Sequence, residues 1–202
     1  MIPRYWQDAQ IYLTAQDAVL AKLINAYPNE VLKTHGNPFA TLMRAVVGQQ
    51  ISIKAADAVW QRLESQIEAF SPTYFLTVEE DLLRECGLSR PKISYLKAIA
   101  LAFENHLLTP ENWHSMSDDE VIKQLLKIRG IGQWTAEMFL IFYLNRPDIL
   151  PLSDLGLLNA IKRHYNFQGK ENILSLAQVW QPYRTVATWY LWRSLDATVV
   201  QY

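Results

Sequence analysis

Residues 125–156 read LLKIRGIGQWTAEMFLIFYLNRPDILPLSDLG. An apolar helical pattern stops at Gly130-Ile131-Gly132, and a second apolar helix begins at once near Gln133. Glycine adopts backbone angles that a Cβ atom resists, so the pattern predicts two helices that meet in a very tight hairpin. The glycines alone are also consistent with a plain corner between helices, in which they only permit close packing.

The start of the second helix offers a place for an anion. The first N–H groups of a helix have no partner within it, and the helix dipole favours negative charge there. Backbone amides at this point, helped by Lys127 or Arg129, can therefore hold a phosphate. Such binding must be local, because the 202 residues include 19 Lys plus Arg against 20 Asp plus Glu and give a net charge of −1.

Asp154 can return toward the hairpin. The predicted helix from Gln133 to Leu144 is about 18 Å long, and the connection 145–153 spans at most about 30 Å. A carboxylate can thus lie in a pocket beside the indole of Trp134 and near the phosphate site. The alternative is that Asp154, or Ser153 before it, only caps the helix that follows.

The remaining sequence shows helical signals and no convincing alternation with period two, which predicts an all-α fold. Ser71-Pro72 and Thr109-Pro110 are typical of helix starts, and Ser117 to Glu120 has the spacing of a capping box. The other predicted helices are Thr14–Tyr27, Phe39–Gly48, Ile53–Ile67, Ser89–Asn105, Val121–Ile128, Asp154–Tyr165, Glu171–Trp180 and Tyr183–Leu195.

Composition excludes several classes of site. Cys86 is the only cysteine, so an intrachain disulfide, a four-cysteine zinc site and a cysteine-ligated iron–sulfur cluster are excluded, and the four histidines lack metal-ligand spacing. The longest nearly apolar run, 136–144, is far shorter than the roughly 20 residues that span a bilayer. The N-terminus has no signal-peptide pattern. We therefore expect an intracellular protein, in the cytoplasm and nucleoid or in a nucleus, that does not contact membranes.

Two motifs together resemble a known family. IRGIGQWTAEMF (128–139) followed by LPLSDLG (150–156) is similar to the helix-hairpin-helix and catalytic-aspartate signature of the 3-methyladenine DNA glycosylase II family, in the helix-hairpin-helix DNA glycosylase superfamily. PFATLMRAVVGQQIS (38–52), GLSRPKISYLKAIA (87–100) and WQPYRTVATWYLW (180–192) resemble further segments of that family in the same order. The resemblance is to the short, all-α form without an N-terminal β-domain.

The resemblance implies a base-excision repair enzyme that flips alkylated purines, 3-methyladenine and also 7-methylguanine, out of damaged duplex DNA and hydrolyses the N-glycosidic bond. Asp154 matches the catalytic aspartate, and Gln50 matches the side chain that fills the gap left by the flipped base. Trp134 stands where lyase members carry a lysine, so we expect no strand cleavage. No cofactor is required for the chemistry.

Further site residues follow partly from the same resemblance and partly from the residues themselves, as with Tyr183, Tyr190 and Arg129. The base pocket is expected to contain Trp134 and Trp192, with Tyr183 and Tyr190 as additional candidates. Phosphate contacts are expected from Arg129, Gly130, Gly132, Gln133 and Thr135. The main-chain carbonyls of Leu126, Ile128 and Gly130 match those that hold a monovalent cation, Na⁺ or K⁺, in the hairpin.

The expected architecture is two helical subdomains with the pocket in the cleft between them. One comprises 38–146, with the helix-hairpin-helix at about 121–144, and the other comprises 1–37 plus 147–202 and carries Asp154. We expect a monomer.

The residues also fit the chemistry. A cationic alkylpurine is attracted by an indole and departs as a neutral molecule, so a single carboxylate beside the developing sugar cation is enough.

Three alternatives remain open at this point. One is a glycosylase of the same fold for uracil or deaminated bases, although neutral leaving groups need an acid and no clear candidate is seen. Another is a non-catalytic helix-hairpin-helix DNA-binding protein, which would not need Asp154 and paired tryptophans. The last is a helical protein-interaction scaffold, which predicts no affinity for DNA.

Overall fold

The computed structural model describes residues 2–34, 36–166 and 169–195, and these residues form helices and no strands. The all-α prediction is confirmed. The described residues divide into two compact units, one from 2–34, 140–166 and 169–195 and the other from 36–139. The sequence placed the two boundaries a few residues later, at 38 and 147. Within the described ranges, no helix is long and apolar enough to cross a membrane.

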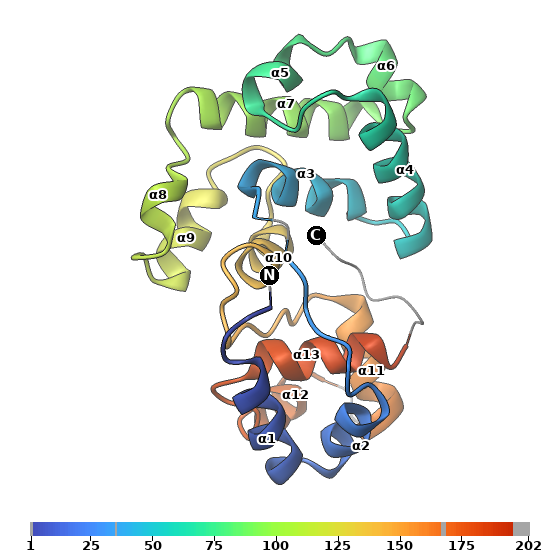
Figure 1. Cartoon of the computed structure of the whole chain (residues 1–202), viewed down its shortest axis with the longest axis vertical. Coiled ribbons are helices and arrows are strands. Elements are labelled where there is room, and N and C mark those ends of the chain that lie inside the picture. Colours follow the sequence, from blue (N-terminus) through green and yellow to red (C-terminus); the bar gives the residue numbers. More distant parts are fainter. Residues whose placement is uncertain (1, 35, 167–168, 196–202) are drawn as a thin grey trace. The chain divides into compact units, whose positions relative to one another are not determined.

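The unit His35–Phe139 is organised around a long helix, α7. Its helices are α3 (Pro38–Gly48), α4 (Ile53–Gln66), α5 (Pro72–Thr77), α6 (Glu80–Glu85), α7 (Arg90–Glu104), α8 (Pro110–Trp113), α9 (Asp118–Leu125) and the part of α10 (Gln133–Phe142) that ends at Phe139. Helix α7 packs against α3, α5 and α6, as Figure 1 shows. Helix α3 is buried from Phe39 to Val47, apart from a half-buried Ala40.

Most of the predicted helix starts in this unit are confirmed. The Ser71 hydroxyl accepts a hydrogen bond from Tyr74 N ahead of Pro72. Ser117 and Glu120 form both bonds of the capping box at the start of α9. Pro110 begins α8, but the Thr109 side chain makes no capping bond there and instead accepts a hydrogen bond from Asn112 Nδ2.

The other unit is built around helix α13. Its helices are α1 (Trp6–Gln16), α2 (Ala18–Ala26), the end of α10, α11 (Leu155–Tyr165), α12 (Lys170–Leu176) and α13 (Arg184–Arg193). Helix α13 contacts α1, α2 and α11 (Figure 1). Its residues from Thr185 to Leu191 are all buried, so this short helix forms the centre of the unit's core.

The prediction of one helix from Thr14 to Tyr27 is wrong. Asp17 is extended (φ −144°, ψ 113°) and separates α1 from α2, and its carboxylate caps α2 by accepting from Val19 N and Leu20 N at 2.8 and 3.0 Å. The second carboxylate oxygen accepts from Tyr165 Oη and Trp180 Nε1, each at 2.8 Å. Partners 148 and 163 residues away therefore fix the break.

Asp17 should be critical for stability. It is only 8% exposed, and burial, together with the Asp17 carboxylate, raises the pKa of Tyr165, so the phenol remains a donor. We expect Asp17→Ala to lower the free energy of unfolding by about 3 kcal/mol or more, because a helix cap is lost and two buried donors lose their acceptor. Urea denaturation measures this loss. Asp8→Ala, at an exposed position of α1, is the control, and an equal loss in both variants would contradict the prediction.

Candidate active site and nucleic-acid interface

Asp154 lies at the start of α11, where hydrogen bonds to its Oδ1 atom orient the side chain. Its Oδ1 atom accepts a hydrogen bond from Leu157 N at 2.6 Å, which caps the helix. The same oxygen accepts from Trp192 Nε1 at 2.8 Å. The side chain is half-buried. The carboxylate therefore caps α11, as one reading of the sequence predicted, and is also oriented by the indole N–H.

Trp192 is fixed from its other side. Its ring stacks on Phe142 with a centroid separation of 6.1 Å and an interplanar angle of 8°. Gly156 leaves room for this arrangement, since a Cβ there would lie 3.0 Å from Asp154 Oδ1 and 3.2 Å from Trp192 Cδ1. Gly156, the glycine of the LPLSDLG motif, thus leaves space for the hydrogen bond between the Asp154 carboxylate and the Trp192 indole.

The connection before Asp154 is anchored to the first turn of α13. Arg184 donates from Nε and Nη2 to the two carboxylate oxygens of Asp148 at 2.7 and 2.8 Å. Thr185 N donates to Pro147 O at 3.0 Å, and its hydroxyl accepts from Ile149 N at 3.0 Å. These bonds join the segment that leads to Asp154 with the helix that carries Trp192.

Tyr183 is placed away from this pair. It precedes α13, and Trp192 lies nine residues further on, about 13 Å along the axis. Its ring packs against Tyr5 and Tyr12 at centroid distances of 6.3 and 5.5 Å. Tyr183 therefore joins α13 to α1, and we leave it out of the proposed base pocket.

Tyr190 is a core residue. It is 0% exposed, packs against the rings of Trp6 and Trp189, and accepts a hydrogen bond from Gln10 Nε2 at 2.7 Å. Burial raises the pKa of its phenol. A ring enclosed by α1 within its own unit has no face for a base, so Tyr190 is also left out of the proposed pocket.

The two glycines of the hairpin differ in what they do. Gly130 has φ +91°, and a Cβ there would collide with the ring of Tyr95 on α7. Gly132 does not have a positive φ, and a Cβ there would meet no atom within 4 Å. The expectation that both glycines relieve backbone strain is therefore wrong for Gly132. Its missing side chain leaves the backbone open at the start of α10.

The other hairpin residues surround that start. The Ala136 N–H donates the first helical bond, to Gly132 O at 3.0 Å. The side chains of Arg129 and Gln133 are exposed, and Trp134 is half-buried. Thr135 is buried, with its hydroxyl accepting from Gln49, so a phosphate contact there would have to use its backbone N–H.

The predicted cation ligands retain capacity for a cation. Ile128 O accepts from Ile131 N at 3.1 Å, and Gly130 O accepts from Gln49 Nε2 at 3.0 Å. A carbonyl oxygen has two lone pairs, so each can still coordinate an ion together with Leu126 O. Carbonyl oxygens suit hard cations, and the residues fit a monovalent ion.

Gln50 has an unusual backbone in the loop Gln49–Ser52, here called the wedge loop. It is exposed and has φ +59°, a conformation that non-glycine residues seldom adopt outside functional or constrained sites. Sequence reasoning missed the role of its neighbour Gln49, whose side-chain amide donates to Gly130 O and to Thr135 Oγ1 at 3.0 and 2.8 Å. The doubled glutamine at 49–50 was the only signal for it.

Comparison with known proteins adds independent findings. Residues 43–183 match the family model described as HhH-GPD superfamily base excision DNA repair protein. The chain is 36% identical over 197 residues to DNA-3-methyladenine glycosylase 1 of Schizosaccharomyces pombe, which covers 92% of this chain and 86% of that protein. It is 29% identical to the alkylbase DNA glycosidase-like protein mag2 of the same yeast, covering 93% of each.

Solved structures give the same result. The structure matches S. pombe 3-methyladenine DNA glycosylase in complex with abasic DNA with a TM-score of 0.84, 34% identity and coverage of 96% of this chain and 100% of that chain. It matches DNA-3-methyladenine glycosidase from Bacillus halodurans with a TM-score of 0.74, 35% identity and coverage of 92% and 88%.

The two glycines form a matched pair for a stability test. We expect Gly130→Ala to lower the free energy of unfolding by about 2 kcal/mol or more, because positive φ and a steric clash add together. Gly132→Ala should cost less than about 1 kcal/mol. Chemical denaturation of both variants measures the difference, and equal losses would contradict the distinct roles assigned to them.

Proposed function

Because the chain belongs to the HhH-GPD superfamily of base excision DNA repair proteins, we propose that it is a monofunctional DNA glycosylase that removes alkylated purines from duplex DNA. The observation that carries the proposal is the carboxylate of Asp154, held by Leu157 N and Trp192 Nε1. The relatives at 34–36% identity are named as 3-methyladenine DNA glycosylases. The protein is thus an N-glycosyl hydrolase of base-excision repair.

Asp154 acts on the sugar. When the N-glycosidic bond breaks, positive charge develops at C1′, the problem that carboxylates also solve in glycoside hydrolysis. A carboxylate that is already oriented stabilises this charge without reorganisation at the moment of reaction. The Trp192 N–H and the start of α11 hold Asp154 in place, and Asp154 orients or deprotonates the attacking water.

Trp192 and Trp134 are proposed to contact the flipped base. An alkylated purine carries a positive charge that an electron-rich indole attracts, whereas normal purines do not. The cationic base leaves as a neutral molecule, so the site needs no strong general acid. We propose 3-methyladenine as a substrate, with 7-methylguanine accepted as well.

The reaction should end with an abasic site and an intact strand. Trp134 stands at the position where lyase members of the superfamily have a lysine, and an indole cannot form a Schiff base. Asp154 provides a carboxylate but no amine. Hydrolysis without strand cleavage follows.

DNA binding is proposed to depend on backbone groups. The N–H groups at the start of α10 meet a phosphate, and the bare Gly132 lets it approach. Arg129 adds charge at the rim, and the carbonyls of Leu126, Ile128 and Gly130 would hold Na⁺ or K⁺, which contributes positive charge near the phosphate. Gln50 fills the gap left by the flipped base.

The substrate also defines where the protein acts. We propose that it works as a monomer on damaged double-stranded DNA, in the nucleoid of a bacterium or in a nucleus. We propose no cofactor for the chemical step. The local phosphate site suits a protein whose net charge is −1, and its affinity for undamaged DNA should be weak.

Base release from methylated duplex DNA tests the proposal directly. The wild-type protein should release 3-methyladenine without nicking the strand. Asp154→Asn should retain the cap of α11, because Asn is a good N-cap residue, and should lower the excision rate by about 100-fold or more, since the charge at the sugar is lost. Chromatography of released bases and a parallel nicking assay measure both outcomes.

Other outcomes point to different functions. Release of uracil or hypoxanthine, but not of 3-methyladenine, would indicate a glycosylase for deaminated bases. Binding to abasic DNA without release of any base would indicate a non-catalytic DNA-binding protein. If the protein neither binds abasic DNA nor releases a base, both the glycosylase and the DNA-binding function are contradicted. That result would support a protein-interaction scaffold.

A further inference from the structure

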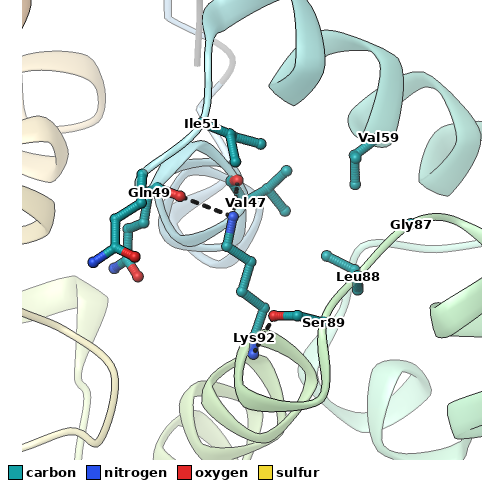
Figure 2. A pocket seen from close by; sticks show the side chains of 9 residues that line it. Val47, Gln49, Ile51, Val59, Gly87, Leu88, Ser89 and Lys92 are labelled. Carbon is teal, nitrogen blue, oxygen red and sulfur yellow. Dashed lines mark hydrogen bonds between the residues drawn. The ribbon is translucent and has the colours of Figure 1, made fainter.

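The wedge loop borders a cavity of about 270 Å³. The cavity lies between the loop, α4 and the segment Gly87–Ser89 that leads into α7, and its apolar walls include Val47, Val59 and Leu88 (Figure 2). Ile51 of the loop also lines it and is 40% exposed. Close packing normally fixes a backbone in one conformation. On the side of the wedge loop that faces the cavity, close packing does not hold the backbone in this way.

Lys92 provides a support of another kind. Its ammonium group reaches past the cavity and donates to Val47 O and Gln49 O at 2.7 and 2.9 Å, as Figure 2 shows. These carbonyls lie at the C-terminus of α3, where carbonyls have no helical partner and the dipole is negative. A cation is the favoured partner there, and its bonds are charge-assisted. Burial lowers the pKa of Lys92, in keeping with a group withdrawn from water.

The loop needs this support because of Gln50. Its left-handed backbone follows directly after Gln49, whose carbonyl Lys92 holds. A strained residue keeps its conformation only when its surroundings determine it more than once. The Gln49 side chain ties the loop to the hairpin, and Ser52 caps α4 by accepting from Ala55 N at 3.2 Å. Lys92 is the third tie, and it lies next to the cavity.

Helix α7 also supports the hairpin. Tyr95, one turn after Lys92, occupies the space that a side chain at position 130 would need, and the Arg129 guanidinium lies 6.0 Å from its ring. Residues three apart share a helix face. One face of α7 therefore fixes the distance between the wedge loop and the proposed phosphate site, since Lys92 holds the loop and Tyr95 holds Gly130.

We infer that Lys92 is a positioning residue, which holds the wedge loop in the conformation that presents Gln50 to the duplex and thereby supports base flipping. This inference rests on the proposed function. Lys92 acts through the loop, so it should matter where a base must be extruded from a stack. It should matter much less where the damaged base is already unpaired.

The first test needs no DNA. Hydrogen exchange of the free protein, followed by mass spectrometry, compares Lys92→Met with the wild type. Met keeps the apolar stem but removes the donors. Peptides that span residues 44–52 should exchange about tenfold faster in Lys92→Met. Lys97→Met is the matched control, because Lys97 is also on α7 and pairs with Glu80 at 3.2 Å, outside the loop. Unchanged exchange in folded Lys92→Met overturns the inference.

The second test measures excision. Single-turnover release of 3-methyladenine should fall about tenfold in Lys92→Met on duplex DNA and less than about twofold on single-stranded DNA. Gln50→Ala should show the same pattern, and Lys97→Met should match the wild type on both substrates. Equal losses on the two substrates would indicate a general structural role and overturn the inference.

The two tests distinguish a failure of the inference about Lys92 from a failure of the proposed function. If the wild type releases no base from either substrate, the proposed function fails. The exchange experiment then still decides whether Lys92 holds the loop, because its result does not depend on catalysis.

Discussion

One carboxylate oxygen, Asp154 Oδ1, accepts hydrogen bonds from Leu157 N and Trp192 Nε1, and its unit is arranged to keep those two bonds. The first turn of α13 anchors the segment before Asp154, Phe142 supports the indole, and Gly156 leaves space beside both. In the proposed reaction, a carboxylate that is fixed in this way would retain its orientation as charge develops on the sugar. This preorganisation is the largest single contribution in many enzymes.

The other unit carries the hairpin that is proposed to meet a phosphate, in a chain whose net charge is −1. In this proposal the binding depends mainly on backbone N–H groups at the start of α10. Gly130 lets the hairpin approach Tyr95, Gly132 leaves the start of α10 open, and Gln49 joins the hairpin to the wedge loop. Gln49 thus links the proposed phosphate site to the loop that carries Gln50.

Features that depend on local sequence were predictable, and features that depend on distant partners were not. The capping box at Ser117 and the cap at Asp154 need only the next few residues. The break at Asp17 was missed because helical periodicity continues through it, while Tyr165 and Trp180 fix it. The packing of Tyr183 against Tyr5 and Tyr12 could not be foreseen because a helix pattern does not reveal which helix covers each face. The hydrogen bonds of Lys92 were missed because their acceptors are backbone carbonyls.

A double-mutant cycle tests the central claim, that Asp154 and Trp192 act as a unit. Single-turnover excision rates would be measured for Trp192→Phe, Asp154→Asn and the combined variant, since Phe keeps an aromatic ring but loses the indole N–H together with the fused five-membered ring. If the indole acts through the carboxylate, Trp192→Phe should slow excision about tenfold alone and by less than about twofold in the Asp154→Asn background. If the rate losses of the two single variants multiply in full in the combined variant, Asp154 and Trp192 act independently and the prediction is wrong.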